Sequence, residues 1–151
     1  GLGGVLLAVA GVGVGELLSV RSLTEELLVS VPEGQRLGGG RSFRWSGVDG
    51  EAVVAFEAGS AVRTVIDEAA KSAGVSVEVV MEVRSLETIQ RMVAAGVGIG
   101  FVSRLALADD VARGLTCRDG RLVRELSVVR RRDRVPSPAA AVFERVLLTR
   151  L

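Results

Sequence analysis

The stretch Ala52–Phe56, AVVAF, followed by EAGSAVRTVIDEAAKSAG at 57–74, decides the fold class of this chain. Five apolar residues in a row are typical of a strand that is buried on both faces. Gly59 then permits a turn, and Ser60 suits a helix start because its hydroxyl can accept a first-turn N–H. The pattern predicts a strand over 52–56 and a helix that begins after Ser60 and ends at Gly74.

The helix predicted after Ser60 has an apolar and a polar face. On the polar face, Asp67 and Lys71 are four residues apart and are expected to form an ion pair. On the other face, apolar residues recur at helical spacing, which predicts packing against a sheet. These residues are Val62, Val65, Ile66, Ala69, Ala70 and Ala73.

The same alternation of strand and helix continues toward the C-terminus. Strands that alternate with helices of about ten residues predict βαβ units, a parallel sheet and right-handed connections. The expected elements are a strand at 75–83, a helix capped by Ser85 and ended by Gly96, a strand at 97–102, a helix from Ser103 to about Arg113, a strand at 122–129 and a helix from Ser137-Pro138 to the C-terminus.

The N-terminal third is less regular. Leu27, Val29 and Val31 alternate with their neighbours, which predicts a strand stopped by Pro32. Residues 33–50 are rich in Gly and Arg and are expected to form an exposed loop with one short turn of helix. Residues 1–15 are uncharged, but they are too short and too rich in Gly for a membrane span and lack a basic signal-peptide region. A buried strand and loop is the expectation for them, and the absence of Met at position 1 suggests a fragment.

Composition narrows the class of protein. The chain has 151 residues, 48% of them hydrophobic and 25% charged, which indicates one globular domain or slightly more. The net charge of +1 provides no overall field to attract nucleic acid or an anionic membrane. Histidine is absent and Cys117 is the only cysteine, so common zinc sites and Ser-His or Cys-His nucleophile pairs cannot be built within the chain. A single cysteine also fits a reducing cytoplasm.

Four stretches, in this order and spacing, resemble the effector-binding domain of LysR-type transcriptional regulators. Together they cover roughly residues 20 to 148. The family's usual winged helix-turn-helix, linker helix and first half-subdomain are not in the chain, and Ser103 stands where the family usually has Pro. The stretches are EELLVSVPEG at 25–34, VVAFEAGSAVRTVIDEAAKSAGV at 53–75, EVRSLETIQRMVAAGVGIGFVSRLAL at 82–107 and LSVVRRRDRVPSPAAAVFERVL at 126–147.

The resemblance implies an α/β, periplasmic-binding-protein-like fold: a parallel-dominated sheet flanked by helices, with one subdomain nearly complete and the other partial. Residues 1–25 would be a remnant of the first subdomain. Residues 26–125 would form the second, effector-binding subdomain. Residues 126–151 would be the return strand and C-terminal helix that pack on the first subdomain.

The resemblance also implies a function. The chain would bind a small organic effector, expected to be anionic, in a cleft between the lobes and thereby alter the conformation of a cytoplasmic regulator. It would not be an enzyme and would need no cofactor or metal. It would not itself contact nucleic acid or a membrane, because the missing helix-turn-helix domain would bind the DNA. It is a possible homodimer.

The first candidate ligand-binding group is Gly59, Ser60 and Ala61. In a parallel sheet, ligands bind where strands end and helices begin, and a helix N-terminus offers free N–H groups to a carboxylate. The alternative is that Ser60 is only an N-cap and Arg63 only a surface residue. The resemblance favours the ligand role for Gly59 and Ser60, and less so for Arg63.

The second candidate group is Gly98, Ile99 and Gly100, which are expected at the end of the third strand. By resemblance they would line the same cleft, since small residues let a ligand approach the backbone closely. Tight packing of the strand against a helix explains the glycines equally well.

Other motifs carry little functional signal. GVGVGE at 11–16 lacks the Lys-Ser/Thr and the helix of a phosphate loop. The basic run at 130–134 is best explained as a solvated strand end, and Cys117 has no sequence neighbour that would activate it. The sequence-adjacent pairs Glu25-Glu26 and Asp109-Asp110 do not share a helix face and make poor acid/base pairs.

Three alternatives to a regulator domain remain open on sequence grounds. One is a solute-binding module of a transport system, which would have a similar fold and a secreted location. Another is a small enzyme that uses Ser60 or a carboxylate, although the absence of His argues against it. The last is a truncated product without a working pocket.

Overall fold

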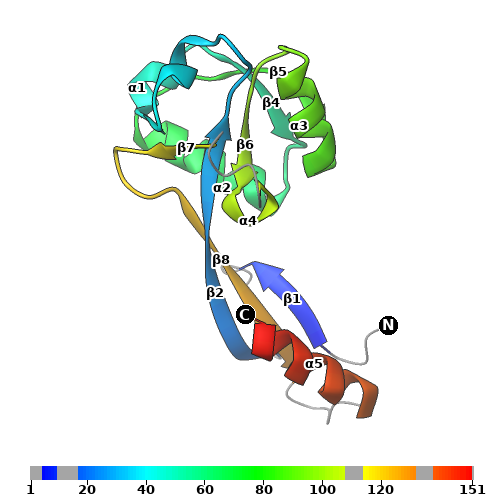
Figure 1. Cartoon of the computed structure of the whole chain (residues 1–151). Coiled ribbons are helices and arrows are strands. Elements are labelled where there is room, and N and C mark those ends of the chain that lie inside the picture. The colour runs from blue at the N-terminus through cyan, green and yellow to red at the C-terminus, as the bar shows by residue number, and fades with distance from the viewer. Residues whose placement is uncertain (1–4, 10–16, 108–113, 132–137, 151) are drawn as a thin grey trace. The chain divides into compact units, whose positions relative to one another are not determined.

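The computed structural model describes residues 5–9, 17–107, 114–131 and 138–150 (Figure 1). The chain divides into two compact units. Unit 2 is Glu25–Val123, and unit 1 combines Gly1–Thr24 with Arg124–Leu151. Several predictions lie outside the described residues: the loop after residue 9, the distal part of the helix expected up to Arg113 with its Asp109-Asp110 pair, and the helix cap at Ser137.

Unit 2 is built on a mixed sheet with the strand order β2-β6-β4-β5. The central strand β4 pairs in parallel with both β5 and β6, as the alternating pattern predicts. β2 runs antiparallel to β6, so the sheet is mixed, with parallel pairing on both sides of its central strand β4. The strands are β2 (Leu17–Ser30), β4 (Ala52–Phe56), β5 (Glu78–Val83) and β6 (Ile99–Ser103).

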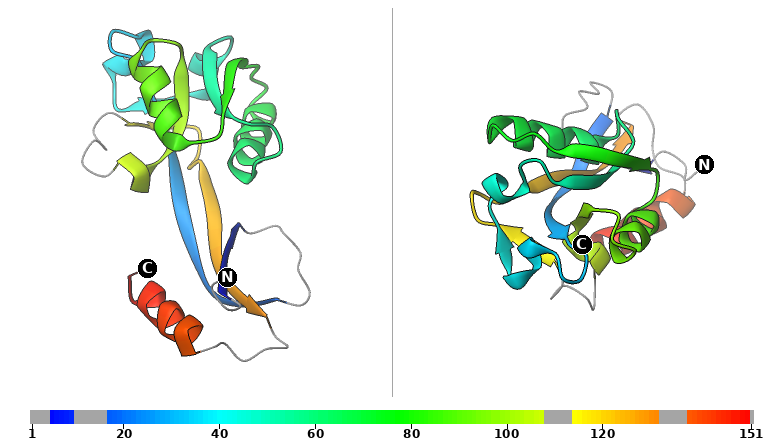
Figure 2. Two further views of the ribbon diagram at one scale, coloured as in Figure 1. Left: turned by 90° about the vertical axis from the view of Figure 1, so that its right-hand side faces the viewer. Right: turned by 90° about the horizontal axis from the view of Figure 1, so that it is seen from above.

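The apolar runs of β2, β4 and β6 are explained by burial on both faces of this sheet. Successive side chains of a strand point to opposite faces, so a strand covered on both sides needs apolar residues throughout. One face packs against α2 and the other against α3 (Figure 2). Leu27, Val29, Val53, Ala55, Ile99 and Phe101 belong to the first cluster, and Leu28, Val54 and Val102 belong to the second.

Both flanking helices begin at the serines that the sequence indicates. α2 (Ala61–Ser72) starts after Ser60, whose Oγ accepts a hydrogen bond from the Arg63 N–H at 3.2 Å. α3 (Leu86–Ala94) starts after Ser85 in the same way. The residues that follow the helices, Gly74 and Gly96, have φ values of 70° and 81°, the left-handed conformation that ends a helix. On α2, Ile66 and Ala70 are buried, but Asp67 pairs with Arg63 instead of the expected Lys71.

Residues 33–50 are more ordered than an exposed loop. They form the short helix η1 (Arg36–Gly39), the strand β3 (Ser42–Phe43) and the helical turn α1 (Trp45–Val48). Phe43, Trp45 and Val48 are buried, and the Trp45 ring stacks on Phe101 with a centroid separation of 5.6 Å. The scarce aromatic residues therefore fasten this segment to the core. β3 pairs in parallel with β7 (Gly114–Cys117), which the sequence reasoning missed, and β7 pairs antiparallel with β2.

The remaining elements are α4 (Arg104–Leu107), which directly follows β6, and the described parts of unit 1. In unit 1, β1 (Val5–Val9) pairs antiparallel with β8 (Val123–Arg131), and α5 (Pro138–Arg150) is the helix predicted after Ser137. Among the described residues, no helix combines the length and apolarity needed to cross a bilayer.

Candidate functional site

The carboxyl ends of β4 and β6 lie at the same edge of the sheet because the two strands are parallel. Open α/β sheets bind ligands at this edge. The turn that follows β4 is held by backbone hydrogen bonds: Glu57 N–H donates to the Val83 carbonyl at 3.0 Å, and Ser60 N–H donates to the Glu57 carbonyl at 3.2 Å. Gly59 has a φ of +89°, which a side chain would disfavour.

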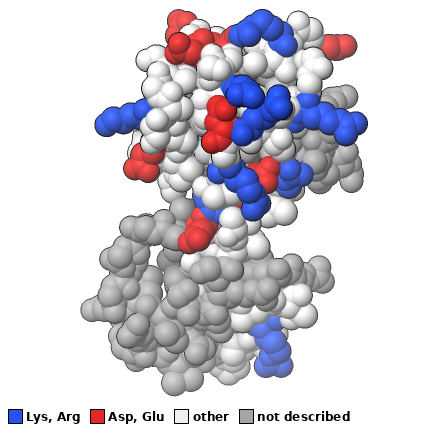
Figure 3. All heavy atoms as spheres, turned by 90° about the vertical axis from the view of Figure 1, so that its left-hand side faces the viewer, with Lys and Arg blue, Asp and Glu red and all other residues white. Residues whose placement is uncertain are grey.

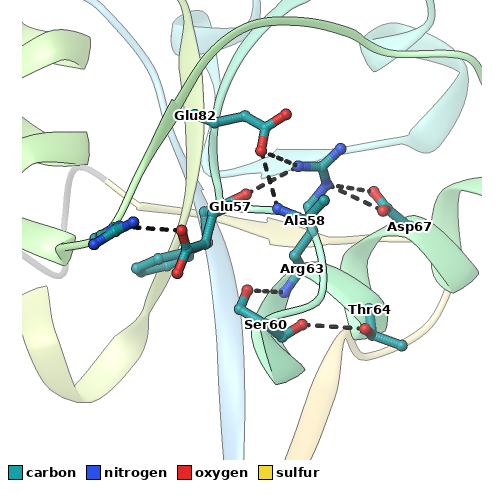
Figure 4. Close-up of polar contacts among 9 residues, drawn as sticks. Glu57, Ala58, Ser60, Arg63, Thr64, Asp67 and Glu82 are labelled. Atoms are coloured by element: carbon teal, nitrogen blue, oxygen red, sulfur yellow. Dashed lines mark hydrogen bonds and ion pairs between the residues drawn. The ribbon is translucent and has the colours of Figure 1, made fainter.

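α2 begins directly at this turn, beside Ser60 (Figure 4). The Arg63 N–H donates a hydrogen bond to Ser60 Oγ, and the Thr64 N–H donates to the Ser60 carbonyl oxygen. The Thr64 hydroxyl also donates to this carbonyl oxygen, at 3.1 Å. Ala61 and Val62 occupy the first two helical positions, whose N–H groups have no acceptor within a helix. Gly59 and Ala61 are exposed and Ser60 is partly exposed. The turn therefore presents two backbone donors and the positive end of a helix dipole.

Arg63 fixes the shape of the turn. Its side chain is only 14% exposed, and its Nη1 donates to the Phe56 carbonyl at 2.9 Å. Its Nε contacts both carboxylate oxygens of Asp67 at 3.0 Å, and Nη1 lies 3.7 Å from Glu82 (Figure 4). Arg63 is thus a structural residue that ties the end of β4 to α2. The interpretation of Arg63 as only a surface residue is wrong.

Glu82 and Arg84 are two further contributors that the sequence reasoning missed. Glu82 accepts the Ala58 N–H at 3.0 Å, and Arg84 Nε lies 3.1 Å from the Glu57 carboxylate (Figure 4). Glu82 lies near the end of β5, the neighbouring strand, and Arg84 directly follows that strand. A parallel βαβ unit places the ends of consecutive strands side by side. The polar residues at the end of the strand predicted over 75–83 are therefore the sequence signal that could have placed Glu82 and Arg84 beside this turn.

The end of β6 carries a second polar cluster. Ser103 donates to Glu25, which is 5% exposed, and accepts the Leu105 N–H at 3.1 Å. The neighbouring Glu26 accepts from Arg104 at 3.0 Å. The pair Glu25-Glu26 is therefore engaged by a hydroxyl and a guanidinium, and β2 places it here because Leu27 pairs with Ser103.

The second predicted group, Gly98 to Gly100, does not join the first. These residues begin β6 instead of ending it, so their expected position at the end of the third strand is wrong. Ile99 pairs with Val53 at the start of β4, whereas Gly59 lies beyond Phe56 at the strand's other end. At about 3.3 Å per residue, the length of the strand separates the two groups by roughly 10 Å.

Close packing explains the glycines of the second group. A β-carbon on Gly98 would lie 2.6 Å from the Ala52 carbonyl oxygen, and one on Gly100 would lie 2.5 Å from Ile89 Cγ2. Ile99 is only 1% exposed. These contacts support the packing alternative at both glycines.

Neither thiol nor metal chemistry is indicated among the described residues. Burial is the largest influence on the Cys117 thiol and raises its pKa, although a hydrogen bond from the Asp119 backbone acts in the opposite direction. A thiol with a raised pKa is a poor nucleophile at neutral pH. Within the described ranges, no three His, Cys, Asp or Glu side chains are grouped to hold a metal ion.

Comparisons with known proteins agree with this architecture. The sequence profile described as "LysR substrate binding domain" matches residues 8–151. A "Probable RuBisCO transcriptional regulator" of Cyanophora paradoxa is 35% identical over 103 residues, which cover 64% of this chain and 32% of that protein. The chain thus spans about a third of the length of this relative.

Two solved structures share the fold. The CcmR regulatory domain of Synechocystis PCC6803, in complex with 2-PG, has a TM-score of 0.83 and 22% identity and covers 96% of this chain and 72% of its own. The effector binding domain of QuiR, in complex with shikimate, has a TM-score of 0.82 and 17% identity, and the match covers 97% of this chain and 70% of the QuiR chain. The fold is accordingly that of the periplasmic-binding-protein-like regulatory domains.

Proposed function

Because this chain belongs to the LysR substrate binding domain family, we propose that it senses a small organic anion at the turn formed by Gly59, Ser60 and Ala61. The observation that carries the proposal is the serine-capped start of α2, exposed at the carboxyl edge of β4 and held by the largely buried Arg63. The ligands named for the two similar structures, 2-PG and shikimate, are small molecules, which supports a ligand of this size.

The chemistry of the turn favours an anion. The N–H groups of Ala61 and Val62 can donate to a carboxylate or phosphate oxygen, and the helix dipole adds a partial positive charge. The acidic side chains nearby are already engaged, Glu82 by the Ala58 amide and Glu57 by Arg84. An arriving anion would meet donors that need no rearrangement, so little binding energy is lost in ordering the site.

In this proposal the ligand acts by stabilising one conformation over another. A ligand can shift a conformational equilibrium only by its difference in affinity for the two states. The full-length regulator would transmit that difference to a DNA-binding domain outside this chain. The chain itself would not contact DNA, would catalyse no reaction, would act in the cytoplasm and would form a homodimer. Its family favours this function over a solute-binding module of a transport system.

Thermal unfolding of the chain with a panel of 2-PG, shikimate, succinate and lactate tests the proposal. A ligand that binds only the folded state raises the melting temperature, by the equivalent of about 2.7 kcal/mol at 100 times its Kd. The decisive variant is Ala61→Glu. A carboxylate at the first helical position suits the dipole and preserves stability, but it repels an anion from the same amides. We expect Ala61→Glu to abolish the ligand-induced rise.

A pair of cap variants provides the matched control. Ser60→Ala and Ser85→Ala each remove a capping hydroxyl and should each lower stability by about 1 kcal/mol. Only Ser60→Ala should weaken the response to ligand, because Ser85 caps a different helix. A panel member that stabilises wild type and Ala61→Glu equally would rule out this turn as the site, and no response to any member would count against the proposal for this class of ligand.

A further inference from the structure

A second part of unit 2 has the character of a binding site and plays no role in the function proposed above. An open hollow of about 580 Å³ lies between α1, the C-terminal end of α2 and the turn at 118–122. Volumes of this order are typical of pockets for small molecules. The hollow is lined by Arg44, Trp45, Ser46, Ala69, Ser72, Ala73, Asp119, Gly120, Arg121 and Leu122.

The floor of the hollow is apolar and rigid. Trp45 and Leu122 are 6% and 5% exposed, and Trp45 is stacked on Phe101 in the core. The backbone N–H of Trp45 donates to the Asp119 carboxylate at 2.8 Å, and this hydrogen bond fixes the turn against α1. A ligand here would meet a preformed wall that does not have to be ordered on binding.

The rim of the hollow concentrates positive charge. β3 and β7 pair in parallel with Phe43 opposite Cys117, and the Arg118 N–H donates to the Phe43 carbonyl at 2.8 Å. Arg44 directly follows β3, lines the hollow and is exposed. Arg121, from the turn at 118–122, lines the same hollow and has a side chain that is 73% exposed.

These arginines are only weakly neutralised by the protein. Among the described residues, no carboxylate lies within 4.0 Å of the charged group of Arg44. Arg121 reaches Glu26 at 3.4 Å, but its side chain remains 73% exposed. Asp119 is the acidic residue of the lining, and it accepts the Trp45 amide. Figure 3 shows basic side chains gathered on this face of unit 2.

The C-terminal end of α2 is the other source of negative charge beside the hollow. Its terminal carbonyls are largely occupied, because Ala69, Ala70 and Lys71 accept hydrogen bonds from the N–H groups of Ala73, Val75 and Gly74. In the lining itself, the two arginines Arg44 and Arg121 outnumber the one carboxylate, Asp119.

We propose that this hollow is a second ligand site, which takes a small organic oxyanion: an apolar body against Trp45 and Leu122, with a phosphate or carboxylate between Arg44 and Arg121. Arginine forks suit both oxyanions. The site is separate from the Gly59–Ala61 turn and does not depend on the function proposed for it.

Trp45 provides the readout, because it is the only tryptophan in the chain. A ¹⁵N–¹H correlation spectrum contains one indole signal, which needs no further assignment. We expect phenyl phosphate to shift this signal saturably. Phenol, which has the same body without the charge, and NaCl at matched ionic strength should shift it far less. The apparent affinity should fall as salt is raised, since the arginines are exposed.

Arg44→Gln and Arg121→Gln identify the residues responsible. Each should weaken phenyl phosphate binding about five- to tenfold, as expected for the loss of a charge-assisted hydrogen bond at an exposed site. Arg91→Gln, an equally exposed arginine that pairs with Glu87 on α3, is the control and should leave the affinity unchanged.

Three results would overturn the second site. These are a shift that grows linearly without saturation, a shift of equal size with phenol, and equal weakening by Arg44→Gln and Arg91→Gln. Ala61→Glu distinguishes the two proposals, because it should leave the Trp45 shift intact. If Ala61→Glu abolishes the shift, the anion acts through the α2 N-terminus and the hollow is not a site.

Discussion

Gly100 of β6 lies directly against Ile89 of α3, so closely that a β-carbon on Gly100 would sit 2.5 Å from Ile89 Cγ2. The same β-carbon would lie 3.1 Å from Val93 Cγ2. Ile89 and Val93 are both buried, so their side chains have little room to move away. The approach of α3 to the sheet is therefore set by the absence of a side chain at this position.

Gly100→Ala should lower the free energy of unfolding by about 1–3 kcal/mol, the usual cost of forcing a methyl group into a packed core. Urea unfolding followed by circular dichroism measures the change. Gly39→Ala is the control, because a β-carbon there meets nothing within 4 Å. Equal stability of the two variants would show that α3 can move away from β6.

Arg63→Gln should lower the free energy of unfolding by about 1–3 kcal/mol, because it removes hydrogen bonds from a side chain that is 14% exposed and leaves the Phe56 carbonyl without this donor. Arg91→Gln breaks an ion pair of similar helical spacing whose side chains are 74% and 72% exposed, so it should cost no more than about 0.5 kcal/mol. Thermal unfolding of both variants compares them. Similar losses would mean that burial of Arg63 adds nothing to its contacts.

Cys117 should react slowly in the folded chain. Burial raises the pKa of its thiol above the ordinary value of 9.0, so the thiolate is scarcer at pH 8 than in the unfolded chain. Because the folded state favours the protonated thiol, the contribution of Cys117 to the stability of the fold is complete below pH 9 and is lost as pH rises through the folded pKa. Iodoacetamide alkylation at pH 8, with and without urea, tests this. Faster reaction in the folded chain would contradict it.

Local pattern was sufficient for the elements of unit 2 that carry their own signals. The run at 52–56 is continuously apolar, and Ser60, Ser85, Gly74 and Gly96 mark the helix ends by their own chemistry. Capping and left-handed φ are properties of one residue and its immediate neighbours, so they can be read along the chain. The turn at Gly59 to Ala61 was identified for this reason.

Elements fixed by distant partners were not predictable in this way. The segment 33–50 lies in the core because Phe43 and Trp45 meet Phe101, more than 50 residues away, and β7 is a strand because β2 and β3 lie beside it. The sequence left open whether Arg63 is only a surface residue, because its partners Phe56 and Glu82 come from two strands that only the folded chain brings beside it.

The sequence by itself determined the alternating strands and helices from 52 to 103, the serine and glycine ends of the two helices between them and the family of the domain, because these depend on residues close together along the chain. Tertiary structure alone decided that Gly98 faces the Ala52 carbonyl and that Phe43 lies opposite Cys117. The register of neighbouring strands sets both relationships, and register is a property of the assembled sheet.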